Sequence, residues 1–232
     1  MGWAAASVAA AVAGGAAWSV RGRASNILGP SRWRGDPQRR TIALTFDDGP
    51  SESTPELLRV LEQYSIPATF FQCGAHIRRL PDIARAVAKV HEVGNHTDTH
   101  PRLWLRSPEF IRREVSAAQV TAATVCSQTP RWFRAPYGVR WPGLASALQA
   151  ESLVNVMWTV IGLDWKREAN QIATRVLERV GNGGIICLHD GRGMQHHPGI
   201  SSTMEAVRRI IPQLLDRGYA FETVTQILCP KT

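Results

Sequence analysis

The sequence has little lysine and little cysteine, and each absence narrows the possible functions. Lysine occurs only at positions 89, 166 and 231, so nearly all of the basic excess is arginine. The cysteines, Cys73, Cys126, Cys187 and Cys229, have no CxxC spacing, which argues against a zinc knuckle. We expect Cys73 and Cys187 to be buried, inert thiols because they lie at or near the ends of apolar runs. A disulfide between Cys126 and Cys229 stays an alternative.

The chain also lacks any signature of an RNA- or DNA-binding module, so no nucleic-acid partner is expected despite the net charge of +8. A basic surface would suit an anionic polymer such as a cell wall or an acidic polysaccharide. Six of the arginines, however, lie between Arg21 and Arg40, outside the expected domain. We therefore favour a juxtamembrane or tail role for them over a substrate-binding face.

Residues 3–20 contain no charge and are followed at once by Arg21 and Arg23. The segment lacks the basic start of a signal peptide, and its Ala and Gly content makes it weakly apolar for an anchor. The arginines that follow would favour a cytoplasmic location by the positive-inside rule. We favour a secreted or envelope-associated protein because of the substrate inferred below, with possible membrane association through this segment. A cytoplasmic location is the alternative.

Two regions are expected. Residues 1–40 would be a targeting or anchoring segment with an Arg-rich linker, and residues 41–232 one catalytic domain, since this length suits a single core.

From residue 41, short apolar runs alternate with helical patterns, which is typical of repeated β–α units. Strands are expected at 41–46, 67–72, 92–95, 131–135, 153–160, 184–188 and 219–224. Helices are expected after Ser53 and over 81–90, 107–125, 142–150, 169–180 and 202–216. This α/β pattern predicts a parallel barrel or an open doubly wound sheet.

Polar clusters follow these strands directly, and the carboxyl ends of parallel strands meet at one face. Asp47 and Asp48 follow the first strand, and we expect them to project differently, so that one binds a metal and the other stays free as a base. His96 and His100, in the order i and i+4, would share one face of a helical turn. With one carboxylate they supply the three ligands of a catalytic zinc site.

Three further clusters follow later strands. Arg134 precedes a Pro/Gly turn and could orient a carboxylate, while the turn exposes backbone N–H groups suited to an oxyanion. Asp164 precedes Trp165, and His189 lies within Leu188-His189-Asp190. A histidine at such a strand end can act as a general acid if a carboxylate sustains its protonated form. Taken alone, the Arg134 segment is equally well explained as a structural loop, and a lone histidine at a strand end is more often structural.

Together, TFDDGP, HTDTH, RAPYG, LDW and LHD, in this order and spacing, resemble the five motifs of the polysaccharide deacetylase family. This is the NodB-homology domain of carbohydrate esterase family 4, and the resemblance covers about residues 41 to 228. It implies a distorted (β/α) barrel with about seven parallel strands that hydrolyses the acetamide of an N-acetylated sugar. One divalent ion is implied, with zinc expected and Co²⁺ or Ni²⁺ as substitutes.

The resemblance assigns the metal to Asp48, His96 and His100, and the role of catalytic base to Asp47. Arg134 would orient Asp47.

On the acid side, His189 would protonate the leaving amine, and the backbone N–H of Tyr137 would help to stabilise the oxyanion. Trp165 and Leu188 would line the acetyl pocket. Many relatives have an Asp three residues before the Asp-Trp pair, where this chain has Ile161. Either Asp164 takes over the tuning of His189, or the histidine is less well tuned.

Other readings remain. A two-metal phosphoesterase would need more ligands than this set offers, and a carbohydrate-binding pseudoenzyme is supported only by Ile161. The expected partner is an N-acetylated carbohydrate, either chitin-like or peptidoglycan, and acetylxylan is the O-acetyl alternative. A monomer is expected.

Overall fold

The computed structural model describes residues 14–15 and 17–229. The apolar segment 3–20, expected to target or anchor the chain, therefore lies mostly outside the described residues. Within the described ranges, no helix combines the length and the apolarity that crossing a membrane requires.

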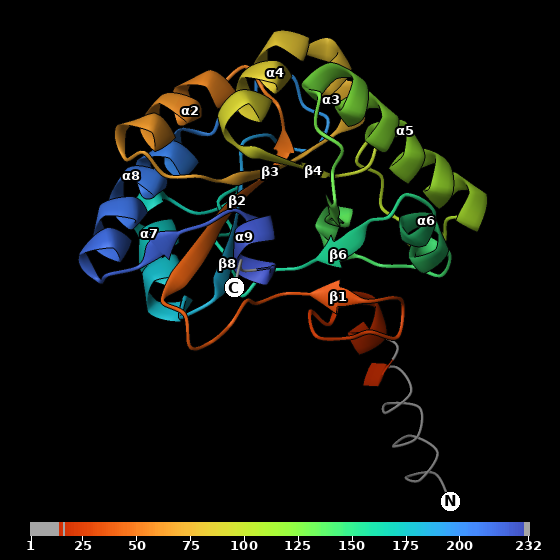
Figure 1. The fold of residues 1–232 in the computed structure, drawn as a ribbon, viewed down its shortest axis with the longest axis horizontal. Helices are drawn as coiled ribbons and strands as arrows, with labels where there is room; N and C mark the ends of the chain where they lie inside the picture. Colours follow the sequence, from red (N-terminus) through yellow and green to blue (C-terminus); the bar gives the residue numbers. More distant parts are fainter. Residues whose placement is uncertain (1–13, 16, 230–232) are drawn as a thin grey trace, which may run out of the picture.

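A nine-stranded sheet forms the centre of the molecule, in the order β1-β6-β5-β4-β3-β2-β8-β7, with β9 paired to β2 beside this path. Every pairing is parallel. The strands are β1 (Ser31–Arg32), β2 (Thr41–Gly49), β3 (Thr69–Gln72), β4 (Glu92–Asn95), β5 (Trp132–Phe133), β6 (Val154–Val156), β7 (Val160–Ile161), β8 (Gly184–His189) and β9 (Ala220–Phe221). No pairing joins β1 to β7 among the described residues, so the barrel is open there. The predicted distorted (β/α) barrel is confirmed (Figure 1).

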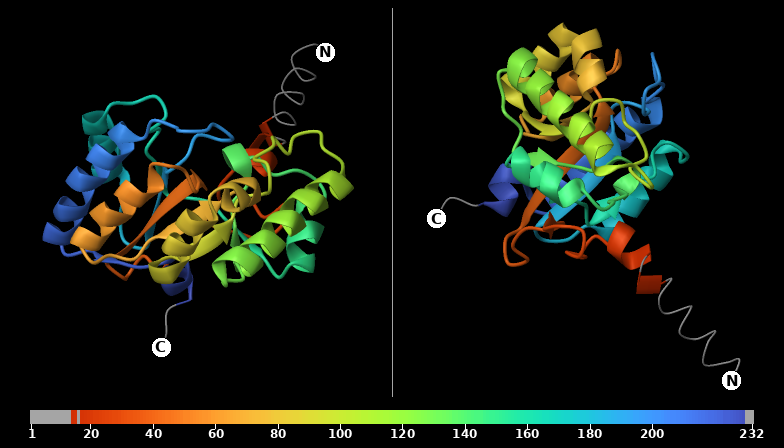
Figure 2. Two further views of the ribbon diagram at one scale, coloured as in Figure 1. Left: turned by 90° about the horizontal axis from the view of Figure 1, so that it is seen from above. Right: turned by 90° about the vertical axis from the view of Figure 1, so that its right-hand side faces the viewer.

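Helices cover the outside of this curled sheet (Figure 2). They are α2 (Thr54–Gln63), α3 (Gly74–Arg79), α4 (Pro81–Val90), α5 (Pro108–Cys126), α6 (Leu144–Ala150), α7 (Ala169–Arg179) and α8 (Ser201–Asp216). The helix α9 (Val224–Leu228) instead packs on the inner side, where Val224 and Ile227 contact the cluster that contains Ala43. The short helices α3 and α9 were not expected from the sequence. The strand expected over 153–160 is divided into β6, which pairs with β1 and β5, and β7, which pairs with β8 on the other side of the sheet.

Side chains alternate between two faces along β2, as in any strand. Ile42, Leu44 and Phe46 belong to the main core beneath the helices. Ala43 belongs to a separate inner cluster, and Asp47 lies on the same inner face at the end of the strand. In the neighbouring strand β8, Ile185, Cys187 and His189 are the register partners of residues 43, 45 and 47. The inner face thus changes from apolar to catalytic residue types along both strands.

Residues 21–40, expected as a polar linker, are instead packed against the domain. Strand β1 pairs with β6, and Arg23 donates to the Thr159 carbonyl at 2.7 Å. Arg39 forms an ion pair with Glu222. This packing moves the amino-terminal limit of the folded domain to before residue 41. Several arginines of this segment are therefore bonded to the domain rather than held in a free tail: Arg23, Arg34, Arg39 and Arg40.

Candidate active site

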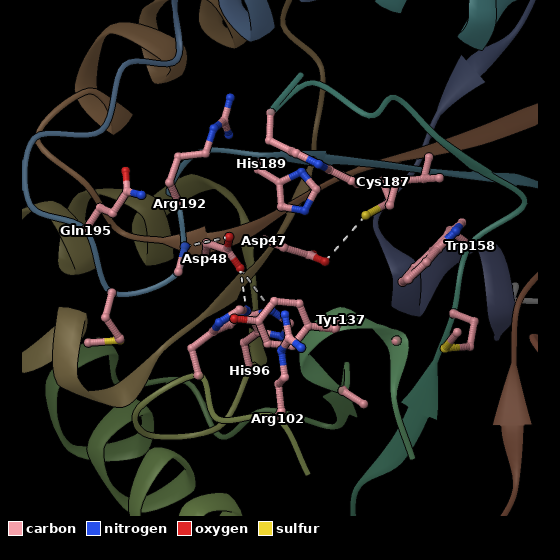
Figure 3. A pocket seen from close by; sticks show the side chains of 18 of the residues that line it. Asp47, Asp48, His96, Arg102, Tyr137, Trp158, Cys187, His189, Arg192 and Gln195 are labelled. Carbon is pink, nitrogen blue, oxygen red and sulfur yellow. Dashed lines mark hydrogen bonds and ion pairs between the residues drawn. The ribbon is translucent and has the colours of Figure 1, made fainter. Parts of the chain in front are cut away.

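A cavity of ≈ 870 Å³ opens at the carboxyl ends of the strands (Figure 3). Most of the predicted site residues line it: Asp47, Asp48, His96, His100, Tyr137, Trp165 and His189. They come from loops and strand ends, and the first and the last of them are more than a hundred residues apart in the sequence. The parallel sheet brings them together, as the strand-end argument predicted.

Asp47 and Asp48 both face this cavity, although strict alternation would place neighbours on opposite faces. The register of β2 against β3 shifts between Asp47 and Gly49, and Asp48 has a φ of 72°. This bulge adds one residue and re-aims the second carboxylate toward the cavity. The two acids reach one site by this backbone distortion.

His96 and His100 lie in a loop after β4, so the expectation of a helical turn was wrong. Thr97 and His100 have φ values of 68° and 54°, and the Thr97 hydroxyl accepts the His100 N–H at 3.1 Å. The loop therefore turns back on itself and brings the imidazoles close, with ring centroids 5.0 Å apart. Asp98, between them, points away and pairs with Arg78.

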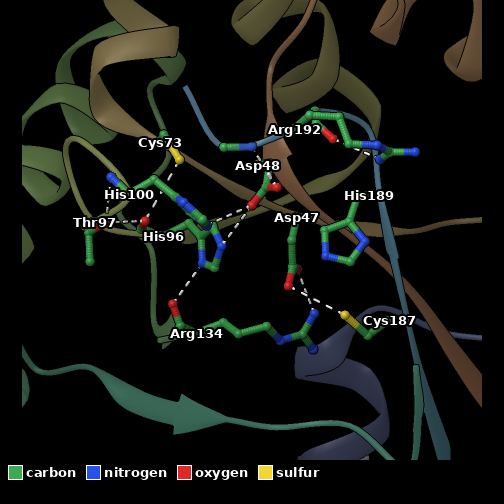
Figure 4. Close-up of polar contacts among 12 residues, drawn as sticks. Asp47, Asp48, Cys73, His96, Thr97, His100, Arg134, Cys187, His189 and Arg192 are labelled. Carbon is green, nitrogen blue, oxygen red and sulfur yellow. Dashed lines mark hydrogen bonds and ion pairs between the residues drawn. The ribbon is translucent and has the colours of Figure 1, made fainter. Parts of the chain in front are cut away.

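The Asp48 carboxylate lies between the two imidazoles (Figure 4). Its Oδ1 is 3.2 Å from Nε2 of His96 and 2.9 Å from Nε2 of His100. His96 Nδ1 lies 2.7 Å from the Arg134 carbonyl, to which it can only donate. In the tautomer that this bond selects, Nε2 carries the lone pair and is the atom that would bind a metal. Acceptors that face one another need a cation between them.

This donor set fits a divalent metal. The ligand atoms of Asp48, His96 and His100 lie within 4.8 Å of one another, and all three residues are buried. Burial raises the pKa of Asp48, but the close contacts with His100 and His96 outweigh burial and hold that pKa well below its usual range. An ionised carboxylate beside two imidazoles is a candidate single-metal site.

Asp47 is held by different partners. Its Oδ1 accepts a hydrogen bond from Arg134 Nη1 at 2.7 Å, and the same nitrogen donates to the Thr45 hydroxyl at 2.7 Å. Arg134 is fully buried, and its guanidinium stacks on Phe71 at 4.1 Å from the ring centroid. The predicted contact between Arg134 and Asp47 is present, and it fixes the carboxylate in one orientation.

Cys187 contacts the other oxygen of Asp47, at 3.4 Å from Oδ2. Burial raises the pKa of this thiol well above its ordinary value, so it stays protonated and donates. The thiol is buried as expected, but its place beside the carboxylate was missed. Counting two residues back from His189 along the strand would have placed it on the same inner face.

His189 is bonded to Asp164, with Nδ1 at 2.8 Å from Oδ1. The Asp164 carboxylate is itself fixed by the Thr203 hydroxyl at 2.7 Å. Burial lowers the pKa of His189, but the charge and hydrogen bond of Asp164 outweigh burial and raise it to about 9. Of the two alternatives, the geometry favours Asp164 as the partner of His189.

Tyr137 lies in the turn after β5, within the 3₁₀ turn η1 (Pro136–Gly138). Its φ of 58° is left-handed, a strained conformation for a residue with a side chain. The hydrogen bonds of the turn run from Gly138 N to Ala135 O and from Val139 N to Pro136 O. Neither bond uses the Tyr137 N–H, which leaves this donor for another acceptor.

The acetyl pocket differs from the expectation at one position. Trp165 lines the cavity and meets His189 edge-on, with ring centroids 5.1 Å apart. Leu188 instead packs in the main core and is fully buried, because it lies on the outer face of β8. Ile161 and Cys187 contribute the apolar lining that Leu188 was expected to supply.

The fold and this site define an α/β-barrel enzyme with a candidate single-metal centre at the ends of its strands. Residues 34–153 match the family model described as polysaccharide deacetylase. A chitooligosaccharide deacetylase of Bradyrhizobium sp. (strain ANU 289) is 37% identical over 198 residues, which cover 81% of this chain and 90% of the relative.

Two solved structures are similar to this chain. One is a peptidoglycan N-acetylglucosamine deacetylase in complex with 4-naphthalen-1-yl-N-oxidanyl-benzamide, with a TM-score of 0.80, 29% identity, and coverage of 86% of this chain and 92% of that chain. The other is a CE4 family pseudoenzyme from Bacillus anthracis, with a TM-score of 0.78, 28% identity, and coverage of 85% and 68%. The chain belongs to the polysaccharide deacetylase family.

Proposed function

We propose that this chain hydrolyses the acetamide of N-acetylglucosamine-type residues in an oligo- or polysaccharide and releases acetate. The observation that carries the proposal is that three groups of side chains meet at one cavity. They are the oriented carboxylate of Asp47, the set Asp48, His96 and His100, and the pair His189 and Asp164. The fold alone would not suffice, since it is shared with a pseudoenzyme. Hydrolysis of an amide needs both activation of water and protonation of the leaving nitrogen.

Asp47 is the proposed base. The Arg134 bond to Oδ1 and the Cys187 contact at Oδ2 hold the carboxylate toward the cavity. In this position Asp47 takes a proton from the attacking water, so that the water oxygen can bond to the acetamide carbon. The developing negative charge on the carbonyl oxygen would accept a hydrogen bond from the Tyr137 N–H.

His189 is the proposed acid. Asp164 engages its Nδ1, which leaves Nε2 to face the cavity and donate a proton to the sugar nitrogen as the C–N bond breaks. A pKa of about 9 keeps the imidazole protonated at neutral pH. The products are acetate and an amino sugar.

Asp48, His96 and His100 would hold one divalent cation, for which we propose zinc because it accepts imidazole and carboxylate ligands together. When bound, it would act as a Lewis acid toward the acetamide carbonyl and make a nearby water easier to deprotonate.

The similar proteins support the choice of substrate, since they include a chitooligosaccharide deacetylase and a peptidoglycan N-acetylglucosamine deacetylase. We place the enzyme at the cell envelope or outside the cell on the same grounds.

Acetate release tests this proposal directly. Purified protein is expected to release acetate from N-acetylglucosamine oligomers or from peptidoglycan, and removal of the cation with a chelator should reduce the rate by at least about 100-fold. Restored turnover on adding back zinc would complete the test. Release from acetylxylan but from neither N-acetylated polymer would identify an O-deacetylase instead, and no release from any of them would contradict the proposal.

The pH dependence should report the His189–Asp164 pair. A general acid is lost as pH rises through its pKa, so the wild-type rate should fall near pH 9. In Asp164→Asn the stabilising charge is gone, the pKa of His189 falls, and the alkaline limb moves to lower pH. Turnover at pH 8 should drop about tenfold or more, measured as a full pH–rate profile.

Asp82→Asn is the matched control, because Asp82 is an exposed carboxylate on α4 that pairs with the exposed Arg85. It should leave the alkaline limb in place. An unchanged limb in folded, metal-loaded Asp164→Asn would remove Asp164 from the role of tuning group.

A further inference from the structure

Arg140 is fully buried, and its guanidinium is bonded to main-chain carbonyls of the amino-terminal segment. Its terminal nitrogens donate to Ser25 O, to Gly22 O at 2.6 Å and to Ser19 O at 3.3 Å. Its own backbone N–H donates to Val20 O at 3.1 Å. Burying a guanidinium is costly unless its donors are satisfied, and the two terminal nitrogens find their acceptors in this segment, while Nε has no partner among the described residues. These bonds tie the segment to the domain.

The carbonyls held by Arg140 lie on both sides of Arg21, and Arg21 lines the active-site cavity. Arg140 comes shortly after the turn that carries Tyr137, so one loop both borders the cavity and anchors the segment. The Arg21 side chain is exposed, and no hydrogen bond or ion pair engages it among the described residues. The segment thus delivers an uncompensated cation to the cavity.

A second arginine stands at the same cavity. Arg102 follows the His100 loop, and its guanidinium lies 4.9 Å from the centroid of the Tyr137 ring (Figure 3). The carboxylates that line the cavity, Asp47 and Asp48, are both buried and already bonded within the site. Neither carboxylate forms an ion pair with Arg21 or Arg102 among the described residues, so both guanidinium groups are open to a ligand.

We propose that Arg21 and Arg102 form a subsite for a carboxylate that the substrate carries beside the acetamide to be hydrolysed. The substrate class is then an N-acetylated oligosaccharide with acidic substituents, and this inference rests on the proposed function. Guanidinium groups bind carboxylates through charge-assisted, paired hydrogen bonds. A neutral oligosaccharide would make no use of the two charges.

The test compares an acidic oligosaccharide, built of N-acetylated sugars with lactyl carboxylates, with its methyl ester. Dissociation constants and acetate release are measured for both. Arg21→Met should weaken binding of the acid form about five- to tenfold more than that of the ester, and Arg102→Met should act likewise. Arg21→Lys should retain most of the preference. The difference between acid and ester should shrink at high ionic strength.

Arg59→Met is the matched control, since Arg59 is an exposed arginine on α2 outside the cavity. It should leave the ratio of acid to ester binding unchanged. Arg140→Met, checked for folding by circular dichroism, should lower the same ratio by releasing the segment.

The subsite would be overturned if Arg21→Met weakened binding of the acid and of the ester equally, or if neither Arg21→Met nor Arg102→Met weakened binding of the acid. The dissociation constants test the subsite even if the wild-type protein releases no acetate. In that case the proposed function fails while the subsite stands.

Discussion

Asp47→Asn should reduce acetate release by at least about 10³-fold while the protein keeps its divalent metal. The asparagine has the same shape and can still accept the Arg134 hydrogen bond, so the fold and the orientation of the side chain are retained. What is lost is the ability to take a proton from water. Turnover, metal content and thermal stability measured on one preparation would check this.

Asp216→Asn, a change of the same kind at the exposed end of α8, serves as the control and should leave all three quantities unchanged. Loss of the metal in Asp47→Asn would instead make Asp47 a ligand and reverse the roles of the two neighbouring acids. Retained turnover would rule it out as the base.

His96→Ala and His100→Ala should each lose the metal and at least about 100-fold of activity, because even weaker, indirect contacts to a metal site cost 10–100-fold. Metal binding to the folded state alone raises stability, so zinc should raise the melting temperature of wild-type protein. That rise should vanish in both variants. Metal analysis after dialysis and melting curves with and without zinc give readouts that do not depend on turnover.

His197→Ala is the control for the histidine changes, since its side chain is 80% exposed and lies outside the cavity. Zinc content and activity that persist when both His96 and His100 are replaced would refute the proposed metal centre.

The sequence predicted β2, β3 and β8 because each contains a short apolar run. Short elements and element ends that depend on distant partners were missed. The helix α9 has five residues, and the division between β6 and β7 reflects their different partner strands, β1 and β5 for β6 but β8 for β7. The edge strand β1 has two residues, too few for any periodicity.

For the site, the sequence predicted which residues meet but not how the backbone presents them. Asp48 and His100 reach the cavity through left-handed conformations that residue type alone does not predict. Leu188 was placed wrongly because the two faces of β8 were not distinguished. Arg21 could not be recognised, since its position depends on the buried side chain of Arg140, about 120 residues away.

Insertions or deletions in β2 preserve the two faces of the strand only if they add or remove an even number of residues. Deleting one residue ahead of Asp47 would exchange the faces of the strand, turning Phe46 toward the cavity and a carboxylate toward the apolar core. Removing the extra residue of the bulge would likewise leave one acid where two are needed. Homologues that keep both acids should therefore keep the spacing from Thr41 to Gly49 constant.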